Sequence, residues 1–494
     1  MHLASPEPEG ENTTLQLLNA TLQLLNVPFI RAQARFALAN ASAAQRQGYA
    51  RVLSALRAGH HQMMFIALGG SVLRGNGCSE PWPNLAVGLN CSYPNRFALW
   101  LQRRYGARRL RYSNRALGGT TTLASLAQIP TLLGLEHGVA QLLPLLKGDG
   151  SSGSVASRQD AVAPADFLLI DFSVNDRTEP AARIAAATEV LLRFLLTERP
   201  SMAILIFEGS CHTVTTRDAH AAVARHYGVP FLAYADVLPR STGCSKKHWT
   251  IVGRGSHPHY STHQLLANVL AVWWDTVGSS IQALSSRTEL RQHGEQRWLS
   301  PSLIYNLSDR RDRSHDDVNK YEHRPTLTPY PLRQPFTDEQ QRKNMGICRT
   351  NLAVYDALHY DADSHRFTAS KLPHVRTSRG NWSVLEDRPG KPGWISDGAV
   401  GSSIGFDLTF GPSPRALIVF EQGYEGFGDA RVSMGAHPTS QELRGVRGDG
   451  VRVTQAQLVT VRDSMLRPNS KETLWVTKVS PAPARVKLRY VSSC

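Results

Sequence analysis

The sequence predicts an α/β domain with a parallel sheet, followed by a domain built as an antiparallel β-sandwich. In residues 48–284, short apolar runs such as MMFIAL (63–68) and DFLLIDF (166–172) alternate with amphipathic stretches of helical length. Strands separated by such helices pair in parallel and are covered by helices on both faces. After residue 345 the pattern changes to alternating apolar and polar positions, broken by glycine and proline, which is typical of half-buried antiparallel strands.

Each expected element of the first domain rests on a local signal. The strands are short apolar runs, the stretch FALWLQRRYG ends in a glycine, and TTTLASLAQIPTLLGL begins with threonines that favour a helix N-terminus. In chain order we expect strand 63–68, helix 97–106, strand 109–114, helix 120–135, strand 166–172, helix 182–198, strand 203–209, helix 220–228, strand 231–237 and helix 263–277. The strands of the second domain are expected in SIGFDLTF, RALIVFEQG, ARVSMGA, VRVTQAQLVTV, TLWVTKV and RVKLRYV.

The chain is too long, at 494 residues, for one ordinary domain. We expect a helical arm over 1–47, the α/β domain over 48–284, a charged and proline-rich linker over 285–345, and the sandwich over 346–494. The arm contains a seven-residue unit written twice, TLQLLNATLQLLNV, which is too short for a stable coiled coil. A low-complexity loop, KGDGSSGSVASRQDAVA, is inserted before the strand at 166–172.

Cysteines and glycosylation acceptors favour a secreted or lumenal protein. Pairing the six cysteines in sequence order gives Cys78–Cys91, Cys211–Cys244 and Cys348–Cys494, although six cysteines allow 15 connectivities. The N-x-S/T acceptors are Asn12, Asn19, Asn40, Asn90, Asn306 and Asn381. The polar, acidic start has no signal peptide and no apolar run is long enough to span a membrane, so the alternatives are a cytosolic protein or a sequence that begins after a leader or anchor.

A net charge of +15 and a pI near 9.8 suggest an acidic partner. Nucleic acid does not fit, because the chain has no basic run interleaved with aromatic residues and no zinc spacing. An acidic polysaccharide fits a secreted protein better. The alternative is that arginine is simply common in this chain.

Four segments that follow the expected strands contain residues able to take part in catalysis. Ser71 stands in the glycine turn GGS, Gly119 ends the segment NRALGG, Asn175 stands in SVND, and His257 stands in SHPH. The carboxyl ends of parallel strands share one edge of the sheet, so these residues are expected to meet there. A serine nucleophile, a histidine base and amide donors for an oxyanion together suit acyl transfer.

These segments resemble the four motif blocks of the SGNH (GDSL-type) hydrolases, which are esterases with a flavodoxin-like α/β/α core. GGS at 69–71, N-x-x-x-x-G at 114–119, VND at 174–176 and HP at 257–258 match the blocks in order over about half of the chain. The resemblance implies a catalytic pair of Ser71 and His257, and an oxyanion hole formed by Ser71, Gly119 and Asn175.

Three positions depart from the family pattern. Gly70 replaces an aspartate, Val174 replaces a glycine, and Arg254 replaces the aspartate that orients the catalytic histidine. Some related enzymes work as serine–histidine pairs, with a backbone carbonyl orienting the imidazole. Asp176 and Glu208 are the candidates from this chain to replace the missing acid.

We therefore expect a serine esterase that acts on small acyl esters, acetyl foremost, carried by a glycan or another small ester substrate. The alternatives are an O-acyltransferase with the same site, or a non-catalytic glycan-binding protein on an SGNH scaffold. The aromatic residues of KPGW (391–394) and FEQGYEGFG (420–428) either stack on sugars or belong to the sandwich core. We expect no cofactor and no metal, because no carboxylate cluster accompanies His257, His259 and His263.

Overall fold

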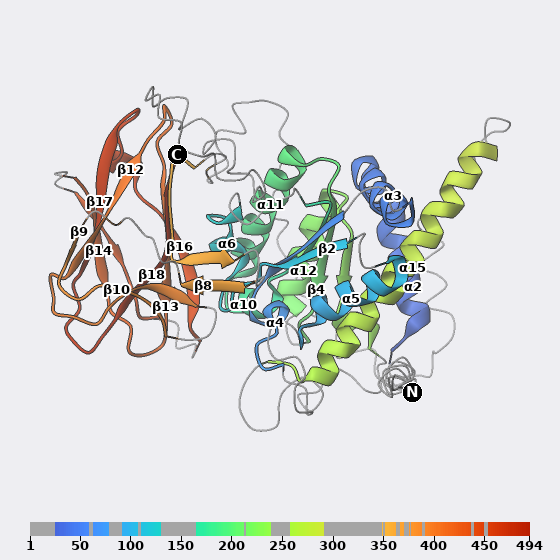
Figure 1. Cartoon of the computed structure of the whole chain (residues 1–494), viewed down its shortest axis with the longest axis horizontal. Helices are drawn as coiled ribbons and strands as arrows, with labels where there is room; N and C mark the ends of the chain where they lie inside the picture. The colour runs from blue at the N-terminus through green and yellow to red at the C-terminus, as the bar shows by residue number, and fades with distance from the viewer. Residues whose placement is uncertain are drawn as a thin grey trace, which may run out of the picture.

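The computed structural model describes residues 25–58, 63–78, 91–106, 110–129, 165–211, 214–238, 257–290, 348, 351–361, 366–369, 375, 377–387, 391–435, 439–448 and 453–494. They form an α/β domain and a β-rich domain that lie side by side (Figure 1). The duplicated unit TLQLLNATLQLLNV (14–27) falls almost wholly outside these residues, as do the loop 147–163 and most of the linker 285–345.

The α/β domain is built on one five-stranded parallel sheet, as predicted. Its strands are β1 (Met63–Gly69), β2 (Leu110–Asn114), β3 (Phe167–Asp171), β4 (Ala203–Glu208) and β5 (Phe231–Ala233). They lie in the order β2-β1-β3-β4-β5, which is the flavodoxin-like order. Ser71, Gly119 and Asn175 follow β1, β2 and β3 and therefore lie at the carboxyl edge of this sheet. His257 lies beside them, just before α15.

Helices cover both faces of the sheet. They are α2 (Val27–Asn40), α3 (Ala43–Ala58), α4 (Ser71–Arg74), α5 (Tyr93–Tyr105), α6 (Thr122–Ser125), α10 (Ser173–Asp176), α11 (Ala181–Glu198), α12 (Val214–His226), α13 (Tyr234–Val237) and α15 (Tyr260–Leu290). Phe65 and Phe167 pack with Trp274 of α15 on one face, while Ile66 and Leu168 join α11 and α12 on the other. This alternation gives the three-layer α/β/α core.

Several elements differ in extent from the sequence-based expectation. The helix expected over 120–135 is α6, which covers only Thr122–Ser125. The helix expected over 220–228 begins earlier, as α12. The strand expected over 231–237 ends at Ala233 and continues as α13, because β5 pairs only with β4 and that partner ends at Glu208. The closing helix, expected over 263–277, extends over Tyr260–Leu290. It packs along α2, whose residues Ile30 and Leu38 share the core of the α/β domain.

The second domain consists mainly of two facing antiparallel sheets, as predicted for a sandwich. Its strands are β6 (Ala353–Asp356), β7 (Leu358–Asp361), β8 (Arg366–Ala369), β9 (Thr377–Arg379), β10 (Ser383–Glu386), β11 (Pro392–Ser396), β12 (Ser403–Thr409), β13 (Ala416–Gln422), β14 (Ala430–Met434), β15 (Ser440–Leu443), β16 (Gln455–Thr460), β17 (Lys471–Lys478) and β18 (Val486–Ser493). One sheet has the order β10-β11-β18-β13-β16 with β6 beside β18, and the other has the order β15-β14-β17-β12-β9. Ile404, Phe406 and Leu408 alternate inward along β12 into the core between the sheets.

The two domains share an apolar interface beside the carboxyl edge of the parallel sheet. Ala124 of α6 packs in one buried cluster with Leu417 and Val419 of β13 and Ala456 of β16. Strand β16 is an edge strand of its sheet, and α6 lies against it. The sandwich is thereby fixed next to the loops that carry the candidate catalytic residues.

Disulfides join Cys78 to Cys91 and Cys348 to Cys494, as sequential pairing predicts. Cys211 is also disulfide-bonded, but its expected partner, Cys244, lies outside the described residues. Asn40 and Asn381, the two glycosylation acceptors within the described residues, are both exposed.

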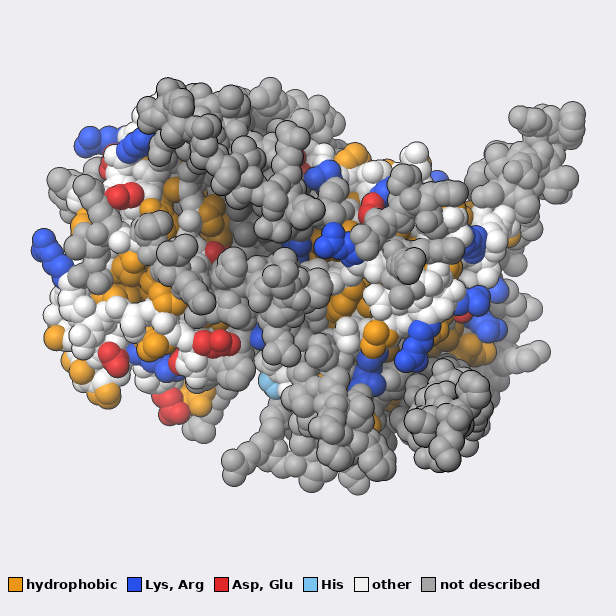
Figure 2. All heavy atoms as spheres, viewed as in Figure 1, with side chains coloured by type: hydrophobic (Ala, Val, Ile, Leu, Met, Phe, Trp, Pro, Cys, Tyr) orange, Lys and Arg blue, Asp and Glu red, His pale blue; other side chains and the backbone are white. Residues whose placement is uncertain are grey.

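In the described part of the chain, no helix has both the length and the apolar composition required to cross a bilayer. On the face seen in Figure 2, Lys and Arg side chains are spread over both domains and do not form one continuous patch.

Candidate active site

Ser71 begins the short helix α4 immediately after the buried strand β1. Gly70 makes the connection in an extended conformation, with φ −94° and ψ −156°. A Cβ added to Gly70 would lie 2.0 Å from Oδ1 of Asn175, so the position of Asn175 leaves no room for a side chain there. Ser71 is buried and lines a pocket at the junction of the two domains.

The turn after β2 places Gly119 on the same pocket. Gly119 has φ +75°, a left-handed conformation that favours glycine. Its carbonyl accepts a 2.8 Å hydrogen bond from the backbone N–H of Ala456, and the Gly118 carbonyl accepts a 3.2 Å bond from Nη1 of Arg489. Two residues of the sandwich therefore hold both peptide carbonyls of this turn.

Asn114, the first residue of the same motif block, is buried beneath the turn. Its Nδ2 donates to the Leu73 carbonyl at 3.0 Å, and its Oδ1 accepts from the Ala116 N–H at 3.0 Å. Asn114 thus ties the end of α4 to the start of the glycine turn.

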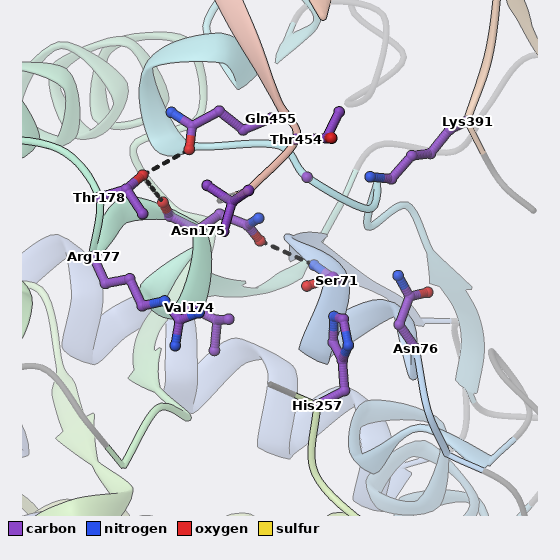
Figure 3. A pocket seen from close by; sticks show the side chains of 12 residues that line it. Ser71, Asn76, Val174, Asn175, Arg177, Thr178, His257, Lys391, Thr454 and Gln455 are labelled. Atoms are coloured by element: carbon purple, nitrogen blue, oxygen red, sulfur yellow. Dashed lines mark hydrogen bonds between the residues drawn. The ribbon is translucent and has the colours of Figure 1, made fainter. Parts of the chain in front are cut away.

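Asn175 lies in α10, directly after β3, and its side chain points to Ser71 (Figure 3). Its Oδ1 accepts a 3.1 Å hydrogen bond from the backbone N–H of Ser71. Two of the three expected oxyanion donors are therefore bonded to one another in this structure. Val174 lines the pocket beside Asn175 and does not prevent this contact.

His257 lies just before α15, and its imidazole faces the hydroxyl of Ser71 (Figure 3). The structure records no hydrogen bond between these two described side chains, a looser geometry that is common before a substrate is bound. Burial, followed by the positive charges of Lys391 and Arg177, lowers the pKa of His257 to about 4. The imidazole is therefore neutral, and able to accept a proton, over a wide pH range.

The sandwich supplies one wall of the pocket. Lys391, Val453, Thr454 and Gln455 line it together with the residues of the α/β domain. Oε1 of Gln455 accepts a 2.6 Å bond from the hydroxyl of Thr178, and its Nε2 donates to Oε1 of Glu179 at 2.6 Å. These bonds join the start of β16 to the segment that follows Asn175.

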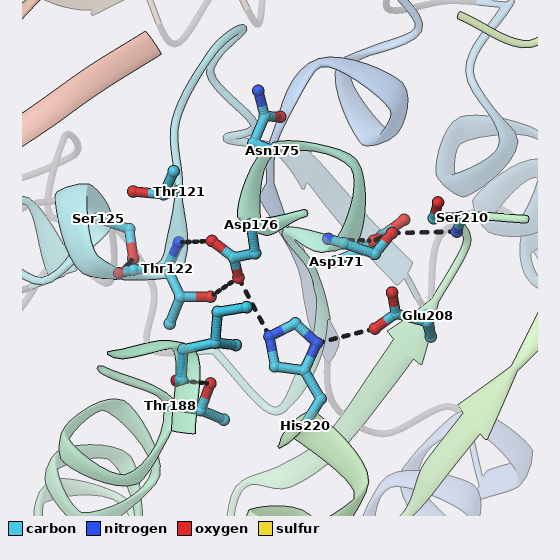
Figure 4. A network of polar contacts seen from close by, with 12 residues as sticks. Thr121, Thr122, Ser125, Asp171, Asn175, Asp176, Thr188, Glu208, Ser210 and His220 are labelled. Carbon is cyan, nitrogen blue, oxygen red and sulfur yellow. Dashed lines mark hydrogen bonds and ion pairs between the residues drawn. The ribbon is translucent and has the colours of Figure 1, made fainter. Parts of the chain in front are cut away.

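The two acids considered as replacements for the missing triad aspartate are engaged elsewhere. Nδ1 of His220 lies 2.7 Å from Oε2 of Glu208, and its Nε2 lies 3.1 Å from Oδ2 of Asp176 (Figure 4). Asp176 also accepts bonds from the N–H and the hydroxyl of Thr122, at 2.8 and 2.5 Å. Neither carboxylate acts as a partner of His257. The expectation that one of them orients His257 is not met, because both are buried around His220.

Burial alone would lower the pKa of His220, but the carboxylates of Glu208 and Asp176 outweigh it and raise that pKa to about 10. His220 is therefore a buried cation at neutral pH. It links α12 to β4 and α10, and through Asp176 to the start of α6.

Arg254 lies outside the described residues. Of the charged groups in the described chain, those that act on His257 are cations. A carboxylate that orients the imidazole is thus not found among these residues.

His263 is fully buried on α15, where its ring stacks on Tyr93 and its Nδ1 accepts from the Tyr93 N–H at 3.2 Å. The structure thus places His263 in the core of the α/β domain. Nδ1 of His259 is 3.0 Å from the Ser261 hydroxyl.

Most of the aromatic residues considered for sugar stacking belong to the sandwich interior. Trp394 is buried against Phe406, and Phe420 and Phe427 are also buried. Tyr424 is exposed. The tryptophan of KPGW, Trp394, therefore belongs to the core of the sandwich. Lys391 is the residue of this motif that lines the pocket.

Sequence reasoning missed Lys391, Gln455 and Arg177 as pocket residues. Arg177 directly follows the VND block, and this adjacency was the only available signal. Lys391 and Gln455 lie in the second domain, and no local pattern indicates that these strands close the pocket of the first.

A solved structure of another protein shares this two-domain arrangement. A two-domain esterase active on acetylated mannans matches the chain with a TM-score of 0.50 at 16% identity, covering 90% of this chain and 95% of that one. The chain shares the two-domain fold of that esterase. The prediction of an SGNH-type core with a second, sandwich domain is thereby confirmed at the level of the fold.

A lipolytic protein of the G-D-S-L family from Desulfitobacterium hafniense matches with a TM-score of 0.29 at 11% identity, covering 43% of this chain and 99% of that one. None of the protein-family models and none of the curated proteins matches the chain.

Proposed function

We propose that the protein is a serine esterase that removes small acyl groups, acetyl foremost, from a glycan. The observation that carries the proposal is the meeting of Ser71, Gly119, Asn175 and His257 on one pocket at the carboxyl edge of the parallel sheet. These residues come from four separate segments, and each has the side chain or backbone that acyl transfer requires. The fold shared with an esterase active on acetylated mannans supports the glycan part of the proposal.

In the first half of the reaction, Oγ of Ser71 attacks the ester carbonyl while the neutral imidazole of His257 takes the hydroxyl proton. The tetrahedral oxyanion accepts hydrogen bonds from the Gly119 N–H, the Asn175 amide and the Ser71 N–H, which exchanges its bond to Asn175 Oδ1 for one to the oxyanion. The C–O bond to the sugar then breaks, and the imidazolium returns its proton to the leaving sugar oxygen.

In the second half, water attacks the acyl-serine with His257 again taking the proton. The intermediate collapses to the free acid, and Ser71 regains its proton from the imidazolium. The positive charges of Lys391 and Arg177 disfavour the imidazolium, and no carboxylate offsets them among the described residues that line the pocket.

The test is the release of 4-nitrophenol from 4-nitrophenyl acetate, and of acetate from acetylated mannan, by the full chain and by Ser71→Ala and His257→Ala. We expect both variants to lose at least about 10³-fold in kcat/KM while keeping the melting temperature of the parent. If the parent protein hydrolyses neither ester, or if Ser71→Ala keeps the parent rate, the proposal is wrong.

We infer that the protein is secreted. The disulfides Cys78–Cys91 and Cys348–Cys494, and the exposure of the glycosylation acceptors Asn40 and Asn381, support this inference.

A further inference from the structure

Three charged side chains are buried on the face of the sandwich that meets the α/β domain. They are Glu421 of β13 and Lys487 and Arg489 of β18, and we call them the charge cluster. Their sheet is the one that lies beside the α/β domain in Figure 1. Leu417 and Val419 precede Glu421 at intervals of two residues and pack in the apolar cluster between the domains. Because side chains alternate along a strand, Glu421 continues this interdomain face.

Glu421 lies between the two cations of the charge cluster. Its Oε2 is 3.4 Å from Nζ of Lys487, and its Oε1 is 3.8 Å from Nη1 of Arg489. Burial lowers the pKa of Arg489, and the charge of Glu421 is the largest of those that counter this effect. Lys487 also pairs with Asp387. One buried carboxylate thus holds both cations near each other.

Each cation also donates to a backbone carbonyl beside the pocket. Nη1 of Arg489 donates to the carbonyl of Gly118 at 3.2 Å, and Gly119 is the next residue. Nζ of Lys487 donates to the carbonyl of Lys391 at 2.6 Å. Gly119 and Lys391 both line the pocket, and the Lys391 ammonium is 2.9 Å from the place that a Cβ on Gly119 would occupy. The two donated bonds therefore act on neighbouring parts of the pocket wall.

The strand that carries Arg489 is irregular at this point. Val419 of β13 pairs with Tyr490 of β18, whereas the next residue, Phe420, pairs with Leu488. Arg489 is therefore the extra residue of a β-bulge. A bulge changes the direction of a side chain, and bulges are frequent beside active sites. Here the bulged residue is the one that reaches the glycine turn.

Buried charges are an inefficient way to hold two domains together. The loss of hydration offsets much of the attraction between them, and apolar residues of similar volume often replace a buried ion cluster without loss of stability. The apolar cluster of Leu417 and Val419 already joins the domains. The cations differ from apolar side chains in that they donate hydrogen bonds to two defined carbonyls. The charge cluster is thus better suited to setting the position of the backbone than to adding stability.

We propose that Glu421 is a positioning residue for the acyl transfer, which acts through Arg489 on the glycine turn and through Lys487 on the backbone of Lys391. The proposal rests on the esterase function proposed above and adds a residue of the second domain that does not itself line the pocket. The Gly119 N–H must meet the oxyanion, and a displacement of about 1 Å in such a group can cost about 10²-fold in rate. Glu421 therefore affects the transition state more than the binding of substrate.

The first experiment measures kcat and KM of Glu421→Gln on 4-nitrophenyl acetate, a neutral ester. We expect kcat to fall at least about tenfold while KM stays within about twofold, because the turn loses its alignment but the rest of the pocket is unchanged. Glu189→Gln is the matched control. Glu189 is a buried carboxylate of α11 that accepts from the Tyr227 hydroxyl at 2.9 Å, and it does not line the pocket. Its loss should lower the melting temperature and leave kcat unchanged.

A second variant separates positioning from stability. In Glu421→Met/Lys487→Met/Arg489→Met the charge cluster becomes apolar, so the melting temperature should be at least that of Glu421→Gln. We expect kcat to remain at least about tenfold below the parent value, because neither carbonyl regains its donor. Recovery of both the melting temperature and kcat would show that the cluster serves only the fold, and would overturn the proposal.

The parent kcat in Glu421→Gln would also overturn the proposal. If the triple variant does not fold, Glu421→Gln and Glu189→Gln are compared at a temperature at which both are folded, and equal kcat values overturn it. Absence of Ser71-dependent hydrolysis in the parent protein would instead overturn the esterase function itself.

Discussion

At the scale of single residues, the site depends on close contacts that leave little freedom. Gly70 lies against Oδ1 of Asn175, and Gly119 has a left-handed backbone beneath the ammonium of Lys391. Within the described part of the chain, the charged groups that act on His257 are the cations Lys391 and Arg177, whereas a catalytic imidazole is usually supported by a carboxylate. Both the close contact at Gly70 and the low pKa of His257 can be tested directly.

Gly70→Ala should impair catalysis without unfolding the protein. The new Cβ would lie 2.0 Å from Oδ1 of Asn175 and would push the amide away from the Ser71 N–H. Loss of one oxyanion donor lowers kcat by about 10²-fold to 10³-fold. Steady-state kinetics on 4-nitrophenyl acetate and the melting temperature measure the two effects. Gly411→Ala is the matched control, because its Cβ would meet only ordinary contacts of 3.5 Å and beyond. Full activity of Gly70→Ala would show that Asn175 has no part in the reaction.

Lys391→Met should move the acid limb of the pH profile to higher pH. The neutral form of His257 is the base, so kcat/KM falls as the pH drops through its pKa, which is about 4 in the folded protein. Removing the Lys391 charge leaves burial and the charge of Arg177, so the pKa should rise part of the way toward the ordinary 6.5. Profiles of kcat/KM on a neutral ester from pH 3 to 8 measure the shift. Lys471→Met, an exposed lysine outside the pocket, serves as control, and an unmoved limb in Lys391→Met would show that His257 is not the titrating base.

At the scale of elements, the loops of the site are braced by buried polar groups beneath them. His220 of α12 is held between Glu208 of β4 and Asp176 of α10, and Asp176 also caps the start of α6 through Thr122. A buried charged group that loses its partner is strongly destabilising. The contacts of His220 and Thr122 with Asp176 therefore hold the segment that carries Asn175 at a fixed distance from the turn that carries Gly119.

Asp176→Asn should destabilise the α/β domain by about 3–5 kcal/mol, because it leaves the His220 cation with one carboxylate instead of two. Urea denaturation followed by tryptophan fluorescence measures this, since Trp273 and Trp274 lie in the core of that domain. The double variant Asp176→Asn/His220→Gln should be more stable than the sum of the single changes predicts. Strictly additive effects would mean that Asp176 and His220 do not interact.

Sequence alone predicts the strands of the first domain and the segments that meet at its pocket, because each signal is local. Ser71 and Asn175 follow apolar runs that end in a turn, and His257 is followed by a proline and a helix. The carboxyl ends of parallel strands lie at one edge of the sheet, so these residues are expected close together. His220 could not be identified in this way, since it stands in an ordinary amphipathic helix and its partners are on two other elements. Lys391 depends on the docking of the second domain, which no local pattern encodes.

At the scale of the whole molecule, the sandwich is part of the site and not only an attached module. Its edge strand β16 donates from Ala456 to the Gly119 carbonyl, Arg489 of β18 donates to the Gly118 carbonyl, and Lys391 reaches into the pocket. The apolar cluster around Ala124 and Ala456 holds the two domains in this register. Catalysis by the first domain is therefore expected to depend on the second.

Ala456→Pro tests this dependence. Proline is tolerated on an edge strand where the N–H points away from the sheet, and here that N–H is bonded to Gly119 rather than to β13. We expect kcat to fall at least about tenfold while the circular dichroism spectrum is unchanged, because the glycine turn loses one of its two supports. Ala456→Gly keeps the N–H and is the control for the lost methyl group. Equal kcat in Ala456→Pro and Ala456→Gly would show that β16 does not support the turn.

The proposed role of Ser71 as nucleophile is tested most directly by its covalent capture. The protein is treated with a fluorophosphonate, which reacts with activated serines, and the labelled peptide is identified by mass spectrometry. We expect one adduct per chain, located on Ser71, with labelling abolished by Ser71→Ala and slowed at least about 10²-fold by His257→Ala. Labelling at another serine, or equal labelling in His257→Ala, would contradict this expectation.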